Sequence, residues 1–371
     1  MRRAPRRAAW GAALMLALAV APAARACAFD AWLPPLTLVD RLFDADAVAL
    51  GVADPEDPAR WVLSGAPRAV STSAYAPDPA AFLAAGADAR PPALDADEAV
   101  LFAHDPLDDV WRRLEVVDRV TRPAIERILA EAPGWQDPLD PARIALAAEM
   151  LGARDGRLRR LALRELDRAP YPTLRALDLP LGADALAESL RDPAAGQSEP
   201  IHALLLGLAG GPRAQALVAG RLGAAAPGEA ISPALGAWAV ALVELQGEAG
   251  VEALDARFLA SEAGRDPADL APIVEALAIQ AEAAPPPVRA RILATLEARL
   301  AARPDLAAPV ARSFGGRGDY AMGPGVQAAL ARRAGLPAAE AMTAAGYVFA
   351  ARKAASPDDA GGGGGAAWTP D

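Results

Sequence analysis

Cysteine and histidine are scarce in this chain of 371 residues, which has one cysteine, Cys27, and two histidines. A single cysteine excludes an intramolecular disulfide. His104 and His202 lie far apart in the sequence, and no third histidine accompanies them, which argues against a metal site built from His and Cys. Each histidine is expected to be a hydrogen-bonded structural residue, and the sequence predicts no metal and no cofactor.

Lysine is almost absent, occurring only as Lys353, and there is no asparagine. The missing asparagine excludes N-glycosylation sequons. The chain has no GxxxxGK phosphate loop, no GxSxG nucleophile elbow and no HExxH zinc pair. These absences argue against nucleotide hydrolysis and zinc proteolysis. No catalytic residue is predicted.

Long apolar runs and excess positive charge are also missing. No segment after residue 27 reaches the roughly 18 apolar residues of a membrane-spanning helix. The formal net charge is −10, which argues against a nucleic-acid binder, because phosphate contacts need a dense basic surface. It also argues against passive docking on an anionic membrane surface. The composition favours a soluble protein.

The first 26 residues have the form of an export signal. Four arginines (2, 3, 6 and 7) precede an apolar run over 11–20, and Ala24-Arg25-Ala26 forms an A-x-A cleavage site. Cleavage there removes five arginines and takes the formal charge from −10 to −15. We expect an exported protein in the periplasm or outside the cell, with an uncleaved N-terminal anchor as the alternative.

Cys27 would be the first residue of the cleaved chain. Residues 24–27 end like a lipobox but lack the usual leucine three positions before the cysteine, so a lipid anchor is one of three alternatives. The others are a free thiol and an intermolecular disulfide. A catalytic thiol is disfavoured because there is no resolving cysteine.

Residues 27–119 are predicted to form a small β-containing domain. Short apolar runs at 47–52, 61–63, 99–102 and 114–117 are bounded by Pro, Gly and Asp, as is typical of strands. A short helix is expected near 38–43 and a Pro/Ala/Asp-rich loop over 76–97.

Residues 120–355 are predicted to be helical. Residues 142–153 and 157–168 each place leucine, isoleucine and alanine on one helix face. Two segments of helix, glycine turn and helix align at an offset of 37, with Gly210 and Gly247 equivalent, and a weaker copy follows over 277–300. Helical hairpins repeated at such a period favour an α-solenoid. Residues 356–371, with five consecutive glycines, are expected to form a flexible tail.

Three motifs resemble uncharacterised exported bacterial proteins with HEAT-like helical repeats: LALRELDRAPY at 161–171, LLLGLAGG at 204–211 and LQGEAG at 245–250. The similarity extends to 47–52 and Trp111. The resemblance implies an N-terminal β-module followed by a mainly α, HEAT-like array of helical hairpins. The family has no established activity that could be transferred to this chain. Such proteins often begin with a Cys-Pro-Phe-Cys-like sequence, whereas this chain has Cys27-Ala28-Phe29-Asp30.

Two groups of charged residues are candidate sites. Arginines 157, 160, 164 and 168 lie along one side of a predicted helix, where they could bind the carboxylates or phosphates of a partner. A solvated helix face paired with nearby acids is the simpler alternative. The N-terminal carboxylates form four groups, 44 and 46, 54–57, 95–98 and 105–109, none with the spacing of a known calcium loop.

Taken together, these features predict an exported, non-enzymatic interaction or scaffold protein that binds another envelope or secreted protein through its helical array. One alternative is an envelope hydrolase that uses the N-terminal carboxylates. The other is a lipid-tethered assembly factor anchored at Cys27.

Overall fold

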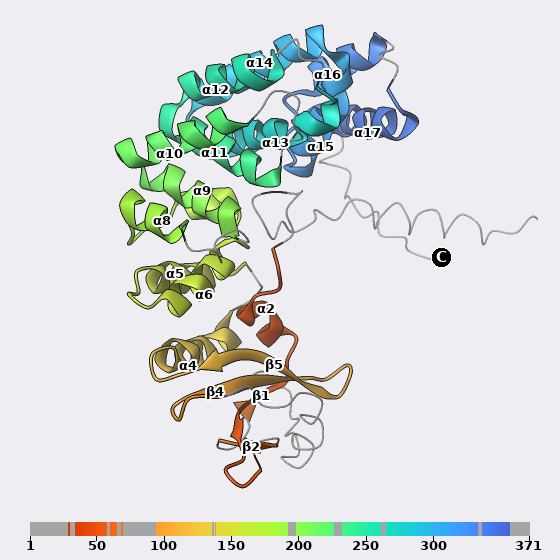
Figure 1. Cartoon of the computed structure of the whole chain (residues 1–371). Coiled ribbons are helices and arrows are strands. Elements are labelled where there is room, and N and C mark those ends of the chain that lie inside the picture. Colours follow the sequence, from red (N-terminus) through yellow and green to blue (C-terminus); the bar gives the residue numbers. More distant parts are fainter. Residues whose placement is uncertain are drawn as a thin grey trace, which may run out of the picture.

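The computed structural model describes residues 29, 34–57, 60–64, 68–69, 94–135, 137, 139–191, 198–225, 232–260, 265–332 and 336–356. The predicted signal, Cys27, most of the predicted 76–97 loop and all but the first residue of the predicted tail lie outside these residues. The protein is mainly helical, with a small antiparallel sheet at one end (Figure 1). The predicted combination of a β-containing part and a mainly helical remainder is confirmed.

The sheet contains β1 (Ala47–Ala53), β2 (Trp61–Leu63), β3 (Arg68–Ala69), β4 (Ala99–Asp105) and β5 (Val110–Val117). Its order is β2-β1-β4-β5, with β3 also paired to β1, and all pairs are antiparallel. A bulge between Leu101 and Phe102 shifts the register, so that Leu101 faces Glu115 and Phe102 faces Arg113. The extra residue of β5 at this bulge is Leu114, and Arg112 and Arg113 just before it are both exposed.

The two faces of the sheet bury different side chains, as the alternation of strand residues requires. One face carries Trp61 and Phe102, whose rings meet edge to face at 5.1 Å. The other face carries Val48 and Leu101 and packs under α4 (Arg122–Glu131), whose Ile125 is buried. Helix α4 therefore covers one face of the sheet (Figure 1).

Short helices and one 3-10 turn flank the sheet in the sequence. They are α2 (Leu38–Phe43), the 3-10 turn η2 (Ala132–Gly134), α5 (Pro141–Leu151), α6 (Gly156–Leu166), α7 (Tyr171–Arg175) and α8 (Ala183–Ser189). Thr37 and Asp40 form a capping box at the start of α2, and Asp140 and Asp155 cap α5 and α6. Helices α2, α5 and α6 lie within two residues of their predicted positions.

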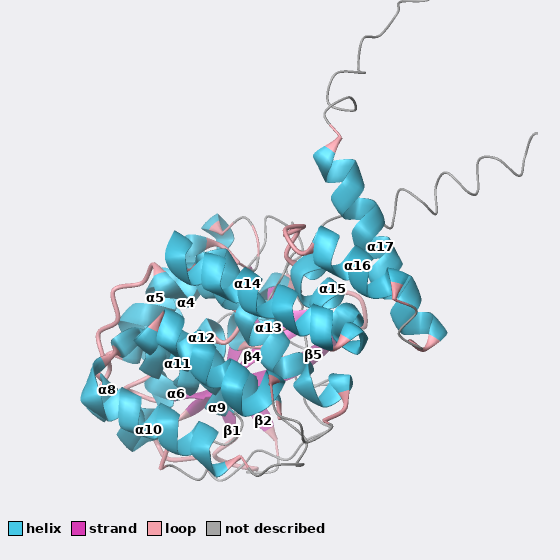
Figure 2. Ribbon diagram, turned by 90° about the horizontal axis from the view of Figure 1, so that it is seen from above, coloured by secondary structure: helices cyan, strands magenta, loops and turns pink. Residues whose placement is uncertain are grey.

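The remaining helices stack in two layers (Figures 1 and 2). In one layer α9 (Glu199–Ala209), α11 (Pro233–Gln246), α13 (Pro267–Ala283), α15 (Ala307–Gly316) and α17 (Ala338–Ala355) each pack on the next. The second layer contains α10 (Gly211–Ala224), α12 (Glu248–Leu254), α14 (Pro286–Ala302) and α16 (Gly323–Ala331), with the π-helical turn η4 (Asp255–Leu259) and the 3-10 turn η5 (Pro304–Leu306).

Glycine has a defined role at the turns and crossings of these layers. Gly210 and Gly247 adopt φ angles of 69° and 59°, and each joins a helix of the first layer to one of the second. The two glycines that the sequence alignment makes equivalent therefore both have a positive φ angle at a turn between two helices. Where α9 crosses α11, a Cβ on Gly207 would lie 2.8 Å from the Ala241 Cα. Only glycine allows these helices to approach so closely.

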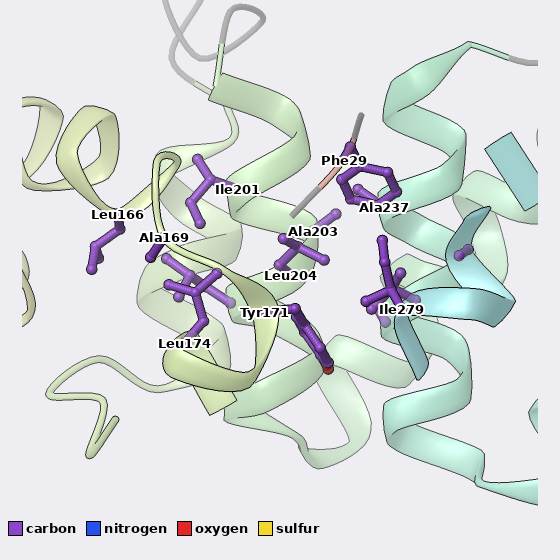
Figure 3. Packing of buried hydrophobic residues seen from close by; sticks show 14 of the residues in the cluster. Phe29, Leu166, Ala169, Tyr171, Leu174, Ile201, Ala203, Leu204, Ala237 and Ile279 are labelled. Carbon is purple, nitrogen blue, oxygen red and sulfur yellow. The ribbon is translucent and has the colours of Figure 1, made fainter. Parts of the chain in front are cut away.

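One cluster of buried apolar residues runs from α2 and the sheet to α17. Figure 3 shows the part of it near α7, α9, α11 and α13. Phe29, nine residues before α2, is buried here beside Ala237 of α11 and Ile279 of α13. Phe29 therefore belongs to the core of the helical layers.

A buried ionic network joins α2, α5 and α6. The Arg143 Nε donates to Glu165 Oε2 at 3.0 Å, and its Nη2 donates to Thr37 Oγ1 at 2.8 Å and lies 2.9 Å from Asp40 Oδ1. Arg143 and Glu165 are each 1% exposed. The backbone N–H of Val39 donates to the other oxygen of Glu165 at 3.2 Å. The network fixes α2 against both helices.

A second polar junction joins α7 to α11 and α13. The Tyr171 hydroxyl donates to Glu244 Oε2 at 2.8 Å and accepts from the Gln280 amide at 3.1 Å. Arg175 donates to Glu244 at 3.1 Å and to the Ala283 carbonyl at 2.6 Å. Burial raises the pKa of Tyr171, with the charge of Glu244 as the second cause.

In the described ranges, no helix combines the length and the apolar character needed to cross a membrane.

Candidate functional site

Helix α6 presents leucines on one side and arginines on the other, as its sequence predicts. It begins at Asp155, whose carboxylate accepts the backbone N–H groups of Arg157 at 2.8 Å and Leu158 at 3.1 Å. Leu161 and Leu166 are buried against α5 and its neighbours. Arg157, Arg160 and Arg164 are exposed on the other side.

Two arginines of the row pair with acids that border the sheet. Arg157 Nη1 donates to Glu98 at 3.1 Å, just before β4, and to Asp118 at 2.7 Å, just after β5. Arg164 Nη2 donates to Glu115 of β5 at 2.9 Å. The hydrogen bond from Arg157 to Glu98 is the largest cause that raises the pKa of Arg157. The row therefore faces the sheet, and part of its charge is balanced within the chain.

Arg168 lies apart from the other three arginines. Its Nε is 3.1 Å from Asp40 Oδ2, its Nη1 donates to the Pro34 carbonyl at 3.5 Å, and its side chain is only 13% exposed. It belongs to the edge of the buried network around Arg143. Arg157, Arg160 and Arg164 of the predicted row are exposed, whereas Arg168 is largely buried.

Two hollows meet at Arg160 and Arg164. The first, about 340 Å³, lies between α6 and β5, and its lining includes Leu94 and Val116. The second, about 220 Å³, lies on the other side of the two arginines. Its lining consists of Pro34, Pro35, Arg160, Leu163, Arg164, Asp167 and Ser198. We call these two hollows together the α6 groove.

The α6 groove combines guanidinium groups with apolar walls. Guanidinium groups bind carboxylates and phosphates through paired N–H donors. Proline and leucine side chains beside them bury apolar groups of a ligand. The groove is therefore suited to an extended segment that carries an acidic group next to apolar residues. Its lining comes from β5, α6, Pro34 and Ser198, which are distant in the sequence.

The structure brings together two of the four predicted carboxylate groups. His104 of β4 lies between Asp46, at 2.8 Å from Nδ1, and Asp109, at 3.2 Å from Nε2. The imidazole also contacts Trp111, with ring centroids 5.2 Å apart. Asp44 and Asp105 line an adjacent hollow of about 490 Å³, whose lining also includes Arg41, His104, Arg112 and Arg113.

The acids of this cluster act as ion-pair partners. Arg112 donates to Asp105 at 3.0 Å and also pairs with Asp108. The hydrogen bond from Arg112 lowers the pKa of Asp105, whereas a catalytic acid needs a raised pKa. In the other two groups, Asp54 accepts from the Glu56 N–H at 2.9 Å and Glu98 accepts from the Asp95 N–H at 3.0 Å, while Glu98 also pairs with Arg157.

Across the parts of the chain that the structure describes, no three His, Cys, Asp or Glu side chains are arranged to hold a metal ion. His202 is buried in α9, with Nδ1 2.8 Å from the Ser198 carbonyl. Burial lowers the pKa of His202. The lowered pKa favours the neutral imidazole, and the hydrogen bond to Ser198 agrees with the structural role that the sequence predicts for His202.

Sequence reasoning missed the apolar walls of the α6 groove. Pro34, Pro35 and Ser198 carry no local pattern that links them to α6, because they approach it only through the tertiary fold. The acids Glu115 and Asp118 were not singled out either, since single acids near strand ends are common. The alternation of arginine and leucine in α6 was the one signal of this site in the sequence.

Comparisons with protein-family models, with curated proteins and with solved structures found no match to this chain.

Proposed function

We propose that the chain is an exported, non-catalytic interaction protein that binds a partner protein of the envelope or extracellular space. In this proposal the helical hairpins form an α-solenoid of HEAT-like repeats, as the resemblance to exported bacterial repeat proteins implies. The two stacked layers from α9 to α17 support this proposal, because stacked hairpins offer an extended surface to a partner.

The observation that carries the proposal is that Arg160 and Arg164 line both hollows of the α6 groove. A partner segment with an acidic side chain between apolar residues would place its carboxylate at these guanidinium groups. Arg164 is half exposed and already contacts Glu115, so a partner carboxylate would compete with that acid. The groove would therefore favour a partner that also buries apolar surface.

The test is charge reversal followed by cross-linking co-purification of the tagged protein from its native cells. We expect the double variant Arg160→Glu/Arg164→Glu to lose a partner that the wild type recovers in stoichiometric amount, with the helical circular dichroism unchanged. Arg213→Glu/Arg312→Glu, on exposed sites of α10 and α15, is the matched control with the same charge change. Equal recovery by both variants would contradict the proposal.

A hydrolase centred on His104 is the second candidate function. Asp46 holds Nδ1 of the imidazole at 2.8 Å, an arrangement that orients a histidine general base. Nε2 lies 3.2 Å from the Asp109 carboxylate, so this exposed side chain would have to turn away before Nε2 could take a proton from water. Hydrolysis of a general ester or glycoside substrate that is abolished by His104→Gln would support this candidate.

Tethering through a lipid on Cys27 is compatible with either function. Cys27 lies two residues before Phe29, which is buried between α11 and α13. A tether at Cys27 would therefore hold the helical layers near the membrane. Intact mass of the protein from its native cells distinguishes a diacylglyceryl-modified chain from an unmodified one.

A further inference from the structure

The last helix exposes an apolar stripe. Six large hydrophobic side chains are exposed among the described residues, and two of them are on α17: Met342 at 75% and Phe349 at 71%. They are seven positions apart and lie on the same helix face. Ala345 and Gly346, also exposed, lie between them. We call these four residues the outer stripe.

The opposite side of α17 is firmly packed. Ala344, Tyr347 and Val348 are buried against α15 and α16. The Tyr347 hydroxyl donates to the Asp319 carbonyl at 2.8 Å and accepts from the Met322 N–H at 3.2 Å. In contrast, a Cβ on Gly346 would meet no described atom within 4 Å. The outer stripe is therefore a rigid surface at the end of the helical layers (Figures 1 and 2).

The outer stripe is symmetric about its centre. Along the helix it reads large, small, small, large, with the midpoint between Ala345 and Gly346. If a second α17 packs antiparallel about this midpoint, Phe349 of each copy meets Met342 of the other. Ala345 meets Gly346 at the crossing, where small side chains allow close approach. Two-fold interfaces require such a self-complementary surface, and methionine sulfur packs favourably against aromatic rings.

The charges of α17 select the antiparallel orientation. Arg352 and Lys353 are exposed beyond Phe349, towards the end of the helix. Glu340, nine positions before Phe349, lies on the opposite side of the helix. A parallel pair would place four positive charges together. An antiparallel pair places them at opposite ends, next to Ala338 and Ala339 of the other copy.

We propose that the outer stripe is a homodimer interface at which α17 of a second copy binds antiparallel. The second helix would lie on the side of α17 opposite its buried residues Ala344, Tyr347 and Val348. A contact of one helix on another falls below the roughly 1,200 Å² of a standard interface. The dimer should therefore dissociate on dilution. This proposal is independent of the α6 groove.

Cysteine cross-linking tests the register. In a Cys27→Ser background, Met342→Cys and Phe349→Cys are prepared as two separate proteins. A disulfide needs Cα atoms within about 7 Å, so oxidation of the mixture should give a disulfide between the two different variants. Each variant oxidised alone should give little dimer. Equal cross-linking of Phe349→Cys with itself, or no cross-linking in the mixture, would overturn the proposal.

Sedimentation equilibrium tests the surface without cysteines. We expect the wild type to be a concentration-dependent dimer and Phe349→Glu to raise the dissociation constant about thirtyfold or more, as for a central interface residue. Leu107→Glu, at a site that is 94% exposed on the β4–β5 turn, is the control and should change nothing. Arg160→Glu/Arg164→Glu should also leave the dimer intact. A wild type that stays monomeric at every concentration would overturn the proposal.

Discussion

Replacing Arg143 with methionine should strongly destabilise the protein. Arg143 is 1% exposed, and its guanidinium contacts Glu165, Thr37 and Asp40. Methionine keeps much of the apolar stem but removes the charge. Asp40 keeps a second cation, Arg168, at 3.1 Å. Glu165, itself 1% exposed, loses its cation and keeps only neutral hydrogen-bond partners.

The loss of stability expected for Arg143→Met comes mainly from Glu165. Removing one partner of a buried ion pair typically costs about 3–5 kcal/mol, because the remaining charge stays buried without compensation. Burial already raises the pKa of Glu165, and loss of Arg143 raises it further. A carboxyl group with a raised folded-state pKa favours the fold below its unfolded value of about 4.3 and opposes it as the pH rises. The cost should therefore be larger at pH 7 than near pH 4.5.

A double-mutant cycle measures the interaction energy between Arg143 and Glu165. It compares the unfolding free energies in urea of the wild type, Arg143→Met, Glu165→Leu and the double variant. The double variant should be more stable than the sum of the single effects predicts, because neither charge is then left alone. Arg127→Met is the control, since Arg127 forms a half-exposed ion pair with Glu131, and it should have little effect. A loss below about 1 kcal/mol for Arg143→Met would refute the reasoning.

Two further predictions concern the helical layers. Tyr171 has a pKa raised by burial, so the folded protein keeps this proton above pH 10, where an unfolded tyrosine loses it. The unfolding free energy should therefore fall as the pH rises past about 10, and it should fall less steeply in Tyr171→Phe. Urea unfolding midpoints at pH 8 and 10.5 measure this difference. An equal decrease in the wild type and in Tyr171→Phe would contradict the prediction. Gly207→Ala should cost about 1–3 kcal/mol through overpacking against Ala241. Gly220→Ala is the control, because a Cβ at Gly220 would have no atom within 4 Å. Thermal unfolding should show that this substitution is neutral or stabilising. A similar loss of stability in both variants would contradict the argument that α9 and α11 cross too closely for a Cβ at Gly207.

Local patterns in the sequence carried much of the secondary structure. The helix predicted at 38–43 is α2, and apolar runs bounded by Pro, Gly and Asp correctly located β1, β2 and β4. The fifth strand was predicted to begin at Leu114 but begins at Val110. Arg112 and Arg113 disguise its first half, because two consecutive exposed arginines interrupt the alternation of apolar and polar residues.

Contacts between distant segments were beyond sequence reasoning. The side chain of Arg143 gives no sign that it is buried, since its partners are 22 and 106 residues away. The arginine row of α6 was recognised as a helix face, but its pairing with Glu115 depends on how α6 lies against the sheet. Helical periodicity alone likewise did not indicate which face of α17 is left uncovered.

Photo-cross-linking from within the α6 groove tests the proposed function most directly. A photoreactive amino acid replaces exposed Pro35, which lines the α6 groove, in one protein and exposed Arg213 of α10 in another, and both are irradiated in the native cells. The account predicts one discrete adduct with a single protein from position 35 and none from position 213. No adduct from position 35, or the same adducts from both positions, would contradict it.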